Sequence, residues 1–281
     1  MINIGLIGCG NIGIALTKAL NDQPTNSAVI STVYDNDQSS INNLLKSVKN
    51  KPLVSNNIDN LLSNNIDLII EAAGQQAVID YIPQALDAHK HVMIMSVGAF
   101  TDTTFYTNLM KLAKEKNVKI YIPSGAIAGI DALKAASLSD IKQVILTTSK
   151  PLKAWSNIPY LKEKKIDLNS IVKPTLIFEG NAEQAAKLFP ANINVSVILS
   201  LAGIGVTKTE VKLIANPDIT QNIHELLISG NFDTLNIKLE NTPSPNNPKT
   251  SYLAILSALN TIQQIHNEIC SGTSYIYSLF S

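Results

Sequence analysis

The sequence predicts an α/β protein with an N-terminal, doubly wound parallel sheet, a second α+β domain built on a mixed sheet, and a C-terminal helix that returns to the first domain. Three observations predict this class. The chain opens with an apolar strand that leads directly into a glycine-rich turn and a helical stretch. Strand and helix patterns then alternate up to Pro123, as in a parallel sheet with crossover helices. Beyond Pro123, strands follow one another with few helices between them, which is typical of a mixed sheet.

The glycine-rich turn follows the first strand, residues 2–7, and reads GCGNIG at residues 8–13. In this GxGxxG spacing Gly8 permits a tight turn, Gly10 lets the backbone approach a phosphate, and Gly13 lets helix and strand pack closely. The start of the next helix offers N–H donors and the positive end of its dipole. We therefore expect a sheet of Rossmann type that binds a dinucleotide, with Asn11 and Ile12 also among the contacts.

The second strand, residues 28–34, ends on Asp35, where a carboxylate accepts hydrogen bonds from the hydroxyls of an adenosine ribose. Asp35 therefore favours NAD over NADP, and the use of both stays open because one acidic residue does not exclude a 2′-phosphate. The alternative is that Asp35, followed by Asn36 and Asp37, simply caps the next helix.

The remaining elements of the first domain alternate regularly. Strands are predicted at residues 53–55, 66–70, 91–95 and 118–122, and crossover helices at residues 75–88 and 103–116. Small residues follow two of these strands, where ligands of open parallel sheets bind. We expect Ala73 and Gly74 to contact the nicotinamide half of the cofactor, the alternative being ordinary strand-to-helix turns.

The second domain is predicted over residues 124–245, with residues 1–123 and 246–281 forming the NAD-binding domain. Its strands are expected at residues 144–148, 175–178, 207–214, 223–228 and 235–239, and its helices at residues 182–188 and 195–206. A loop rich in proline and asparagine, residues 241–248, precedes a closing helix at residues 251–269. We expect this domain to bind the substrate and to form a homodimer through exposed strand edges.

Composition narrows the function classes. The chain has 281 residues, 45% of them hydrophobic, so it can bury a substantial core. The charges of its 22 basic and 22 acidic residues cancel. Binding to nucleic acid or to an anionic membrane surface would require a basic face, so neither partner is expected. We expect a small-molecule substrate, no metal site, and, because no charged and apolar leader follows Met1, a cytoplasmic protein.

All 22 basic residues are lysines, so a carboxylate must be bound without a guanidinium clamp. Lys150 follows hydroxyl residues and Lys249 precedes them, so both lysines are candidate anion sites. The alternative at the second position is that Thr250 caps a helix and that Lys249 is merely exposed. The glycine-containing segment from Ser124 through Gly125 to Ala132 could bind a carboxylate or the nicotinamide amide through its N–H groups, or serve as a hinge.

His224 is the histidine that we single out, because it shares a predicted strand face with Leu226 and Ile228. Such a side chain either points into an enclosed site or is a core group with satisfied hydrogen bonds. Histidine is the side chain most easily tuned for proton transfer at neutral pH.

Five segments, taken in order, resemble the L-aspartate dehydrogenase family. They are SGAIAGIDA at residues 124–132, FEGNAEQAAKLFPANINV at residues 178–195, SLAGIG at residues 200–205, the NxH of residues 222–224 and NPKTSYLA at residues 247–254. The resemblance implies oxidative deamination of L-aspartate by NAD(P)+ through an imine, giving oxaloacetate and ammonia or supplying iminoaspartate for NAD biosynthesis.

The same resemblance implies roles for individual residues. His224 matches the catalytic histidine, and Ala126 with either Asn192 or Asn194 matches cofactor contacts. For the two substrate carboxylates we expect polar and cationic partners: Ser124, Gly125, Lys150, Asn222, Lys249 and Thr250. The chain departs from the family at Ser149, where arginine is common, and at Asn216, where aspartate is common, which puts substrate affinity in doubt.

Two other functions stay open. One is a different two-domain dehydrogenase of amino-acid metabolism, such as a homoserine dehydrogenase. The other is an NAD-sensing protein that kept the fold and lost turnover. Reduction of NAD+ in the presence of L-aspartate would distinguish them.

Overall fold

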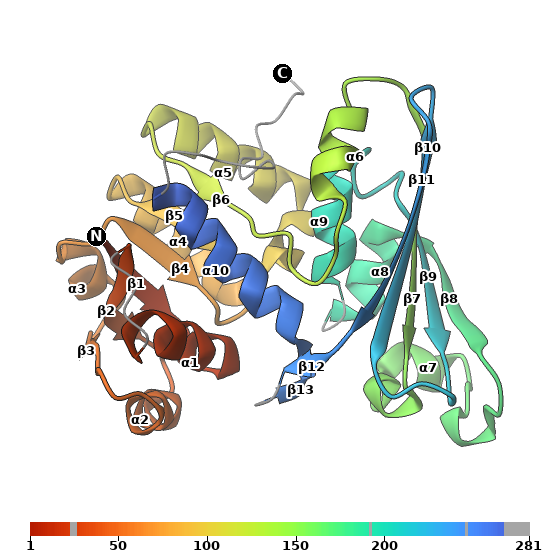
Figure 1. Ribbon diagram of the computed structural model, residues 1–281, viewed down its shortest axis with the longest axis horizontal. Helices are drawn as coiled ribbons and strands as arrows, with labels where there is room; N and C mark the ends of the chain where they lie inside the picture. Colours follow the sequence, from red (N-terminus) through yellow and green to blue (C-terminus); the bar gives the residue numbers. More distant parts are fainter. Residues whose placement is uncertain (23–26, 191–192, 245–246, 267–281) are drawn as a thin grey trace. The chain divides into compact units, whose positions relative to one another are not determined.

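The computed structural model describes residues 1–22, 27–190, 193–244 and 247–266, with the backbone alone at residues 243–244, 247–250 and 266 (Figure 1). The chain forms two compact units, the first comprising Met1–Pro123 and Ile255 onward, and the second comprising Ser124–Ala254. The break after Pro123 lies where the sequence places it. The return to the first unit begins at Ile255 rather than at the expected residue 246, because the segment before it belongs to the second unit.

The first unit is built on a six-stranded parallel sheet in the order β3-β2-β1-β4-β5-β6. The strands are β1 (Ile2–Ile7), β2 (Ala28–Tyr34), β3 (Leu53–Val54), β4 (Leu68–Glu71), β5 (His91–Ile94) and β6 (Ile120–Tyr121). The order reverses between β1 and β4, so the loops that follow these strands lie at a topological switch point, where ligands of such sheets bind. The predicted doubly wound parallel sheet is confirmed.

Helices connect these strands. They are α1 (Asn11–Thr17) with the π-helical turn η1 (Lys18–Asp22), α2 (Gln38–Ser47), α3 (Ile58–Ser63), α4 (Gln75–Asp87), the 3₁₀ turn η2 (Val97–Thr101) and α5 (Thr103–Glu115). The bounds of α4 and α5 follow the predicted crossover helices within a residue. Side chains of Asp37 and Asp102 cap α2 and α5 by accepting hydrogen bonds from N–H groups of the first turn.

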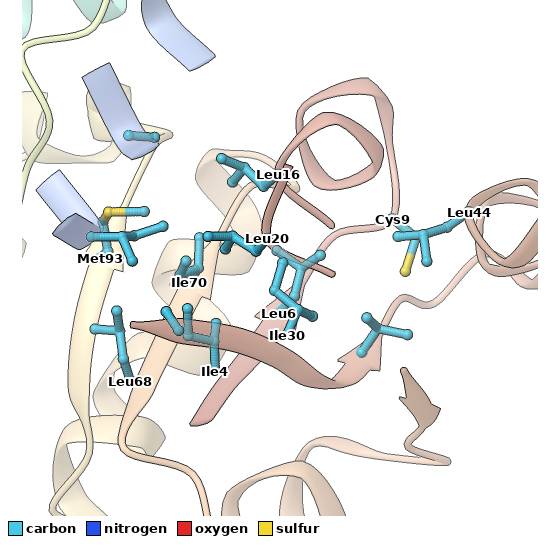
Figure 2. Packing of buried hydrophobic residues seen from close by; sticks show 14 of the residues in the cluster. Ile4, Leu6, Cys9, Leu16, Leu20, Ile30, Leu44, Leu68, Ile70 and Met93 are labelled. Atoms are coloured by element: carbon cyan, nitrogen blue, oxygen red, sulfur yellow. The ribbon is translucent and has the colours of Figure 1, made fainter. Parts of the chain in front are cut away.

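The hydrophobic core on one face of this sheet combines residues of β1, β2, β4, β5 and β6 with residues of α1, η1, α2 and helix α10, Tyr252–His266 (Figure 2). Alternate strand residues such as Ile4, Leu6 and Ile70 belong to the same cluster as Leu16 of α1. Helix α10 adds Ile255, Ala258 and Ile262 to the same core. The predicted closing helix therefore does pack on the first domain.

The second unit contains a five-stranded mixed sheet in the order β11-β10-β7-β9-β8. Its strands are β7 (Ile141–Lys150), β8 (Thr175–Asn181), β9 (Glu210–Ala215), β10 (Asn222–Gly230) and β11 (Thr234–Asn241). Only β7 and β9 run parallel to each other among these pairs. The mixed sheet predicted for the second domain is confirmed.

The helices of the second unit are α6 (Ile130–Ala136), η3 (Leu152–Trp155), α7 (Pro159–Glu163), η4 (Leu168–Ser170), α8 (Ala182–Leu188) and α9 (Asn194–Ala202). One sheet face is buried, with Val211, Leu213 and Ala215 of β9 packed against an aromatic cluster around Trp155 and Phe189. The segment predicted as a loop at residues 241–248 instead contains a two-stranded hairpin of β12 (Pro243–Ser244) and β13 (Asn247–Ser251).

Within the described residues, no helix combines the length and the apolar character that crossing a membrane requires.

Candidate active site

The glycine turn has the geometry that the GxGxxG spacing predicts. Gly8 has a positive φ of 104°, and a Cβ there would lie 2.6 Å from the carbonyl carbon of Ala72. A Cβ on Gly13 would collide with the carbonyl oxygen of Gly8. A Cβ on Gly10 would meet nothing within 4 Å. Packing inside the protein therefore requires Gly8 and Gly13, whereas Gly10 faces open space that fits a close-lying pyrophosphate.

Asp35 lies directly against this turn. Its Oδ2 accepts a 2.7 Å hydrogen bond from the Cys9 N–H, and its Oδ1 accepts one of 2.9 Å from the Asp37 N–H. The cap of α2 is Asp37, whose side chain accepts from the N–H groups of Ser39 and Ser40. The alternative that Asp35 caps this helix is therefore wrong, and its carboxylate is fixed beside the turn where an adenosine ribose would lie.

Cys9, between the glycines, is a free and buried thiol. Burial, together with the negative charge of Asp35, raises the pKa of Cys9 to about 12. The thiol is thus protonated at neutral pH and is not a nucleophile.

Glu71, at the end of β4, is a buried carboxylate that the sequence analysis did not single out as functional. Its exposed fraction is 0%, and its Oε1 accepts hydrogen bonds of 2.8 Å from the N–H groups of Ala73 and Gly74. Ser96, after β5, donates both its N–H, at 3.0 Å to Oε2, and its hydroxyl, at 2.8 Å to Oε1. Desolvation raises the pKa of Glu71 although all four donors favour the carboxylate.

These hydrogen bonds connect the two loops that follow β4 and β5 at the switch point. Glu71 joins the loop after β4 to the loop after β5, and it occupies the N–H groups of Ala73 and Gly74 that a ligand would otherwise use. Gly74 has φ of 154°, and a Cβ there would meet nothing within 4 Å. The loop thus offers a cofactor an open, small-residue surface rather than free N–H donors.

His224, in the second unit, lies on the buried face of its sheet. It is 4% exposed and pairs in register with Thr148 of the neighbouring strand β7. The Thr148 hydroxyl oxygen lies 2.9 Å from Nδ1 of the imidazole, within hydrogen-bond distance. Leu226 and Ile228 continue the same face, as predicted.

Lys150, two residues after Thr148, lies on the same strand face and is only 9% exposed. Its Nζ lies 5.6 Å from the centre of the Trp155 ring. Burial lowers the pKa of Lys150 to about 8. Burial and, secondarily, the charge of Lys150 lower the pKa of His224 to about 3, so the imidazole is neutral at physiological pH.

The segment after Pro123 forms a turn with two positive φ angles, 69° at Gly125 and 79° at Gly129. Both Gly125 and Ala126 are buried, and Ser124 is half-buried. The Ala126 carbonyl accepts a 3.1 Å hydrogen bond from the Asn241 side chain, whose own oxygen accepts one of 2.9 Å from the Ser251 hydroxyl. This buried network fixes the turn within the second unit.

The remaining predicted site residues lie in β10, in α9, in β13 or outside the described residues. Asn222 lies two residues before His224 in β10 and is half-buried, and Asn194 begins α9. Asn192 lies outside the described residues. Lys249 and Thr250 lie in strand β13, not in the predicted turn, and their side chains are outside the description.

The departures from the family pattern do not fall on the His224 face. Ser149 alternates with Thr148 and Lys150 along β7 and therefore points to the opposite face of the sheet. The Asn216 N–H donates to the Lys150 carbonyl at 3.0 Å, and the Asn216 side-chain oxygen accepts from the Asp218 N–H at 2.9 Å.

Comparisons with known proteins identify the family of the chain. Residues 8–123 match a family described as "Homoserine dehydrogenase, NAD binding domain", and residues 131–265 match one described as "Aspartate dehydrogenase, C-terminal". The L-aspartate dehydrogenase of Methanococcoides burtonii is 46% identical over 274 residues, which are 97% of this chain and 100% of that protein. The chain belongs to the L-aspartate dehydrogenase family.

Further relatives agree with this assignment. The L-aspartate dehydrogenase of Methanosarcina barkeri is 44% identical over 97% of this chain and 100% of its own length. The crystal structure of aspartate dehydrogenase from Thermotoga maritima superposes with a TM-score of 0.74 at 27% identity, covering 97% of this chain and 100% of that one. The resemblance predicted from the five segments is confirmed. As an L-aspartate dehydrogenase family member with an open glycine turn, the chain takes NAD(P) as its cofactor.

Proposed function

We propose that this protein catalyses the NAD(P)-dependent oxidative deamination of L-aspartate to oxaloacetate and ammonia through iminoaspartate, or releases the imine for NAD biosynthesis. The observation that carries the proposal is His224, buried beside Thr148 and Lys150 on one face of the second unit's sheet. Its relatives of matching length are named L-aspartate dehydrogenases.

The first unit supplies the cofactor site in this proposal. The pyrophosphate would lie at Gly8, Gly10, Asn11, Ile12 and Gly13, where Gly10 faces open space. Asp35 would accept hydrogen bonds from the adenosine ribose, which favours NAD over NADP. The nicotinamide half would lie toward Ala73 and Gly74, after β4, with Ala126 and Asn192 or Asn194 as further contacts. The bound cofactor accepts the hydride from the substrate.

The second unit supplies the groups that act on the substrate. His224 uses Nδ1 to bond Thr148, so Nε2 is the ring atom that would direct the attacking water toward the imine carbon. The substrate carboxylates would be bound by Lys150, by the Ser124 and Gly125 turn, by Asn222 and, from strand β13, by Lys249 and Thr250. Lys150 is the strongest of these candidates because a buried ammonium attracts a carboxylate far more than an exposed one does.

A substrate panel tests the activity. L-aspartate, L-homoserine and other amino acids are each offered with NAD+ and with NADP+, and absorbance of the reduced cofactor is followed. We expect L-aspartate alone to give rapid reduction. A protein that binds NADH in a titration but reduces no cofactor with any amino acid would be a sensor, and reduction with L-homoserine alone would favour the other dehydrogenase class.

A His224→Ala variant tests the catalytic assignment. Turnover should fall by about 10²-fold, because the attacking water loses the group that orients it, while NADH affinity stays unchanged. An unchanged turnover would contradict the role of His224.

We also propose that the protein is a cytoplasmic homodimer. The free, buried thiol of Cys9 suits a reducing compartment. The sheet face opposite to His224 carries half-buried apolar residues, Ile145 and Leu227, beside Lys212 and Glu225, a mixed-charge surface that can pair with a second copy. A single species of monomer mass in sedimentation at micromolar concentration would exclude the dimer.

A further inference from the structure

We infer that the Lys150 amine carries protons during the reaction, and that His224 positions water beside it. This inference deepens the proposed function and rests on it. It assigns to Lys150 a catalytic role in addition to binding a carboxylate.

Strand register brings the groups together. Thr148 and Lys150 lie two residues apart on β7 and share a face, and Thr148 pairs directly with His224 of β10. The hydrogen bond of 2.9 Å between Thr148 and His224 fixes the imidazole on this face. The charge of Lys150 therefore acts on a histidine whose ring orientation is set by the fold.

The surroundings of Lys150 keep it inside the protein. Trp155 is fully buried, and its Nε1 donates to the carbonyl oxygens of Lys150, at 3.3 Å, and of Ile214, at 3.2 Å. This hydrogen bonding holds the indole ring beside the lysine side chain, whose Nζ lies 5.6 Å from the ring centre. An ammonium group in such a place loses hydration, which favours the neutral amine.

His224, on the neighbouring strand, is a titratable group within range of the Lys150 charge. Burial lowers the pKa of Lys150 to about 8, whereas burial and the Lys150 charge lower the pKa of His224 to about 3. A proton carrier works best when its pKa lies near the operating pH. Lys150 meets this condition and His224 does not, since the imidazole would be a weak base.

The first half of the reaction uses the neutral amine once. The Lys150 Nζ takes a proton from the substrate ammonium, which frees the nitrogen lone pair. With NAD(P)+ bound as hydride acceptor, the Cα–H bond would then break with its electron pair leaving as a hydride, and the C–N bond would become the C=N bond of an iminium ion. L-aspartate is thereby oxidised and NAD(P)+ is reduced, and the lysine ammonium releases its proton to solvent.

The second half uses the same amine again. Water held by His224 forms a bond from its oxygen to the iminium carbon while Lys150 accepts the water proton. Lys150 returns that proton to the nitrogen of the carbinolamine. The C–N bond then breaks, the hydroxyl proton passes to Lys150, and ammonia leaves with that proton as ammonium, so that oxaloacetate remains and the amine is neutral again.

The substitution that separates charge from proton transfer is Lys150→Arg. Arginine keeps the positive charge but does not lose its proton in proteins. The Lys150→Met variant removes both properties from a buried position that an apolar chain suits well. The matched control is Lys142→Met, which changes an exposed lysine of the same strand.

Turnover of L-aspartate and binding of succinate, a dicarboxylate without the amine, are measured for each variant. We expect Lys150→Arg to bind succinate while its turnover falls by about 10²- to 10⁴-fold. Lys150→Met should lose both succinate binding and turnover, and Lys142→Met neither. The rise of kcat/KM as the pH passes the Lys150 pKa of about 8 should be absent from Lys150→Arg.

Amine rescue provides a second readout. Ethylamine added to a Lys150→Ala variant should restore part of the turnover, with a pH dependence that follows the amine. Turnover of Lys150→Arg close to that of the unmodified protein, with the same pH profile, would overturn the inference and leave Lys150 as a charge only. If the unmodified protein itself reduces no cofactor with L-aspartate, the proposed function fails instead.

Discussion

The hydroxyl oxygen of Thr148 lies 2.9 Å from Nδ1 of His224, and both side chains are buried on the inner face of the paired strands β7 and β10. A histidine in a site of this kind needs a partner for the nitrogen that does not react, because that partner fixes both ring orientation and tautomer. Thr148 fills this role through a contact between residues far apart in sequence.

A Thr148→Val substitution tests this relationship. Valine keeps the shape of the side chain but leaves the buried Nδ1 without its partner, which should cost about 1–3 kcal/mol of stability. We expect kcat to fall more than KM changes, since the ring loses its orientation. Steady-state kinetics and urea unfolding measure the two effects. Thr148→Ser, which restores the hydroxyl, is the control, and equal behaviour of the valine and serine variants would contradict the positioning role.

Glu71 joins the loop after β4, which we assign to the nicotinamide half of the cofactor site, to the loop after β5. Glu71→Gln places an NH₂ group where backbone N–H donors point, so up to about 1–3 kcal/mol is lost for each donor left unsatisfied. We expect weaker binding of NADH with a smaller effect on ADP-ribose, which lacks the nicotinamide. Isothermal titration with both ligands measures this difference.

The control for Glu71 is Glu115→Gln, a change at the exposed end of α5. It should alter neither affinity. If Glu71→Gln weakens NADH and ADP-ribose equally, or weakens neither, Glu71 does not position the nicotinamide side of the site.

The contrast between these residues shows what sequence can and cannot predict. The GCGNIG turn is a local pattern whose geometry depends on neighbouring residues, and the face shared by His224 and Leu226 follows from strand alternation alone. The role of Thr148 depends on the register between two strands, and that of Glu71 on the approach of Ser96 from another loop. No local spacing specifies either contact, and the burial of Lys150 depends likewise on the position of Trp155.

The hairpin after β11 shows a second reason why part of the fold was not predicted from the sequence. Its prolines predict a loop, because proline cannot donate to a strand ladder. A two-stranded ladder, however, consists only of edge strands, which accept proline at positions whose N–H would not be paired. Pro243 pairs with Ser251 in this way, and the second unit therefore extends to Ala254 instead of ending at residue 245.

Cofactor preference should depend on the charge of Asp35. Its carboxylate is held at the glycine turn by the Cys9 N–H, so a 2′-phosphate beside it would meet a like charge. Asp35→Asn should shift the ratio of kcat/KM for NAD+ over NADP+ toward NADP+ by at least about tenfold, the equivalent of ~1.4 kcal/mol. Initial rates with each cofactor measure the ratio.

Asp37→Asn serves as the matched control because Asp37 caps α2 and does not contact the turn. It removes a charge two residues away and should leave the cofactor ratio unchanged, since asparagine also serves as a helix N-cap. Equal shifts in both variants would mean that general charge, and not the fixed position of Asp35, sets the preference.

The lowered pKa of His224 makes the free energy of unfolding depend on pH. The imidazole pKa is about 3 in the folded protein and 6.5 as its ordinary value, so between these pH values the unfolded chain binds a proton that the folded protein does not. Stability present above pH 6.5 is therefore lost as the pH falls toward 3, with a slope of at most about 1.4 kcal/mol per pH unit from this group.

His224→Asn should remove this contribution, because asparagine does not titrate and its side chain can still bond the Thr148 hydroxyl. Urea unfolding across the window from pH 6.5 to about 3 should show a shallower decline for this variant than for the unmodified protein. The control is His89→Asn at an exposed position with φ of 57°, which asparagine tolerates. Because Glu71, whose pKa is raised, opposes the trend equally in all three proteins, the difference between variants isolates His224. Parallel curves for His224→Asn and the unmodified protein would mean that the imidazole titrates as it does in the unfolded chain.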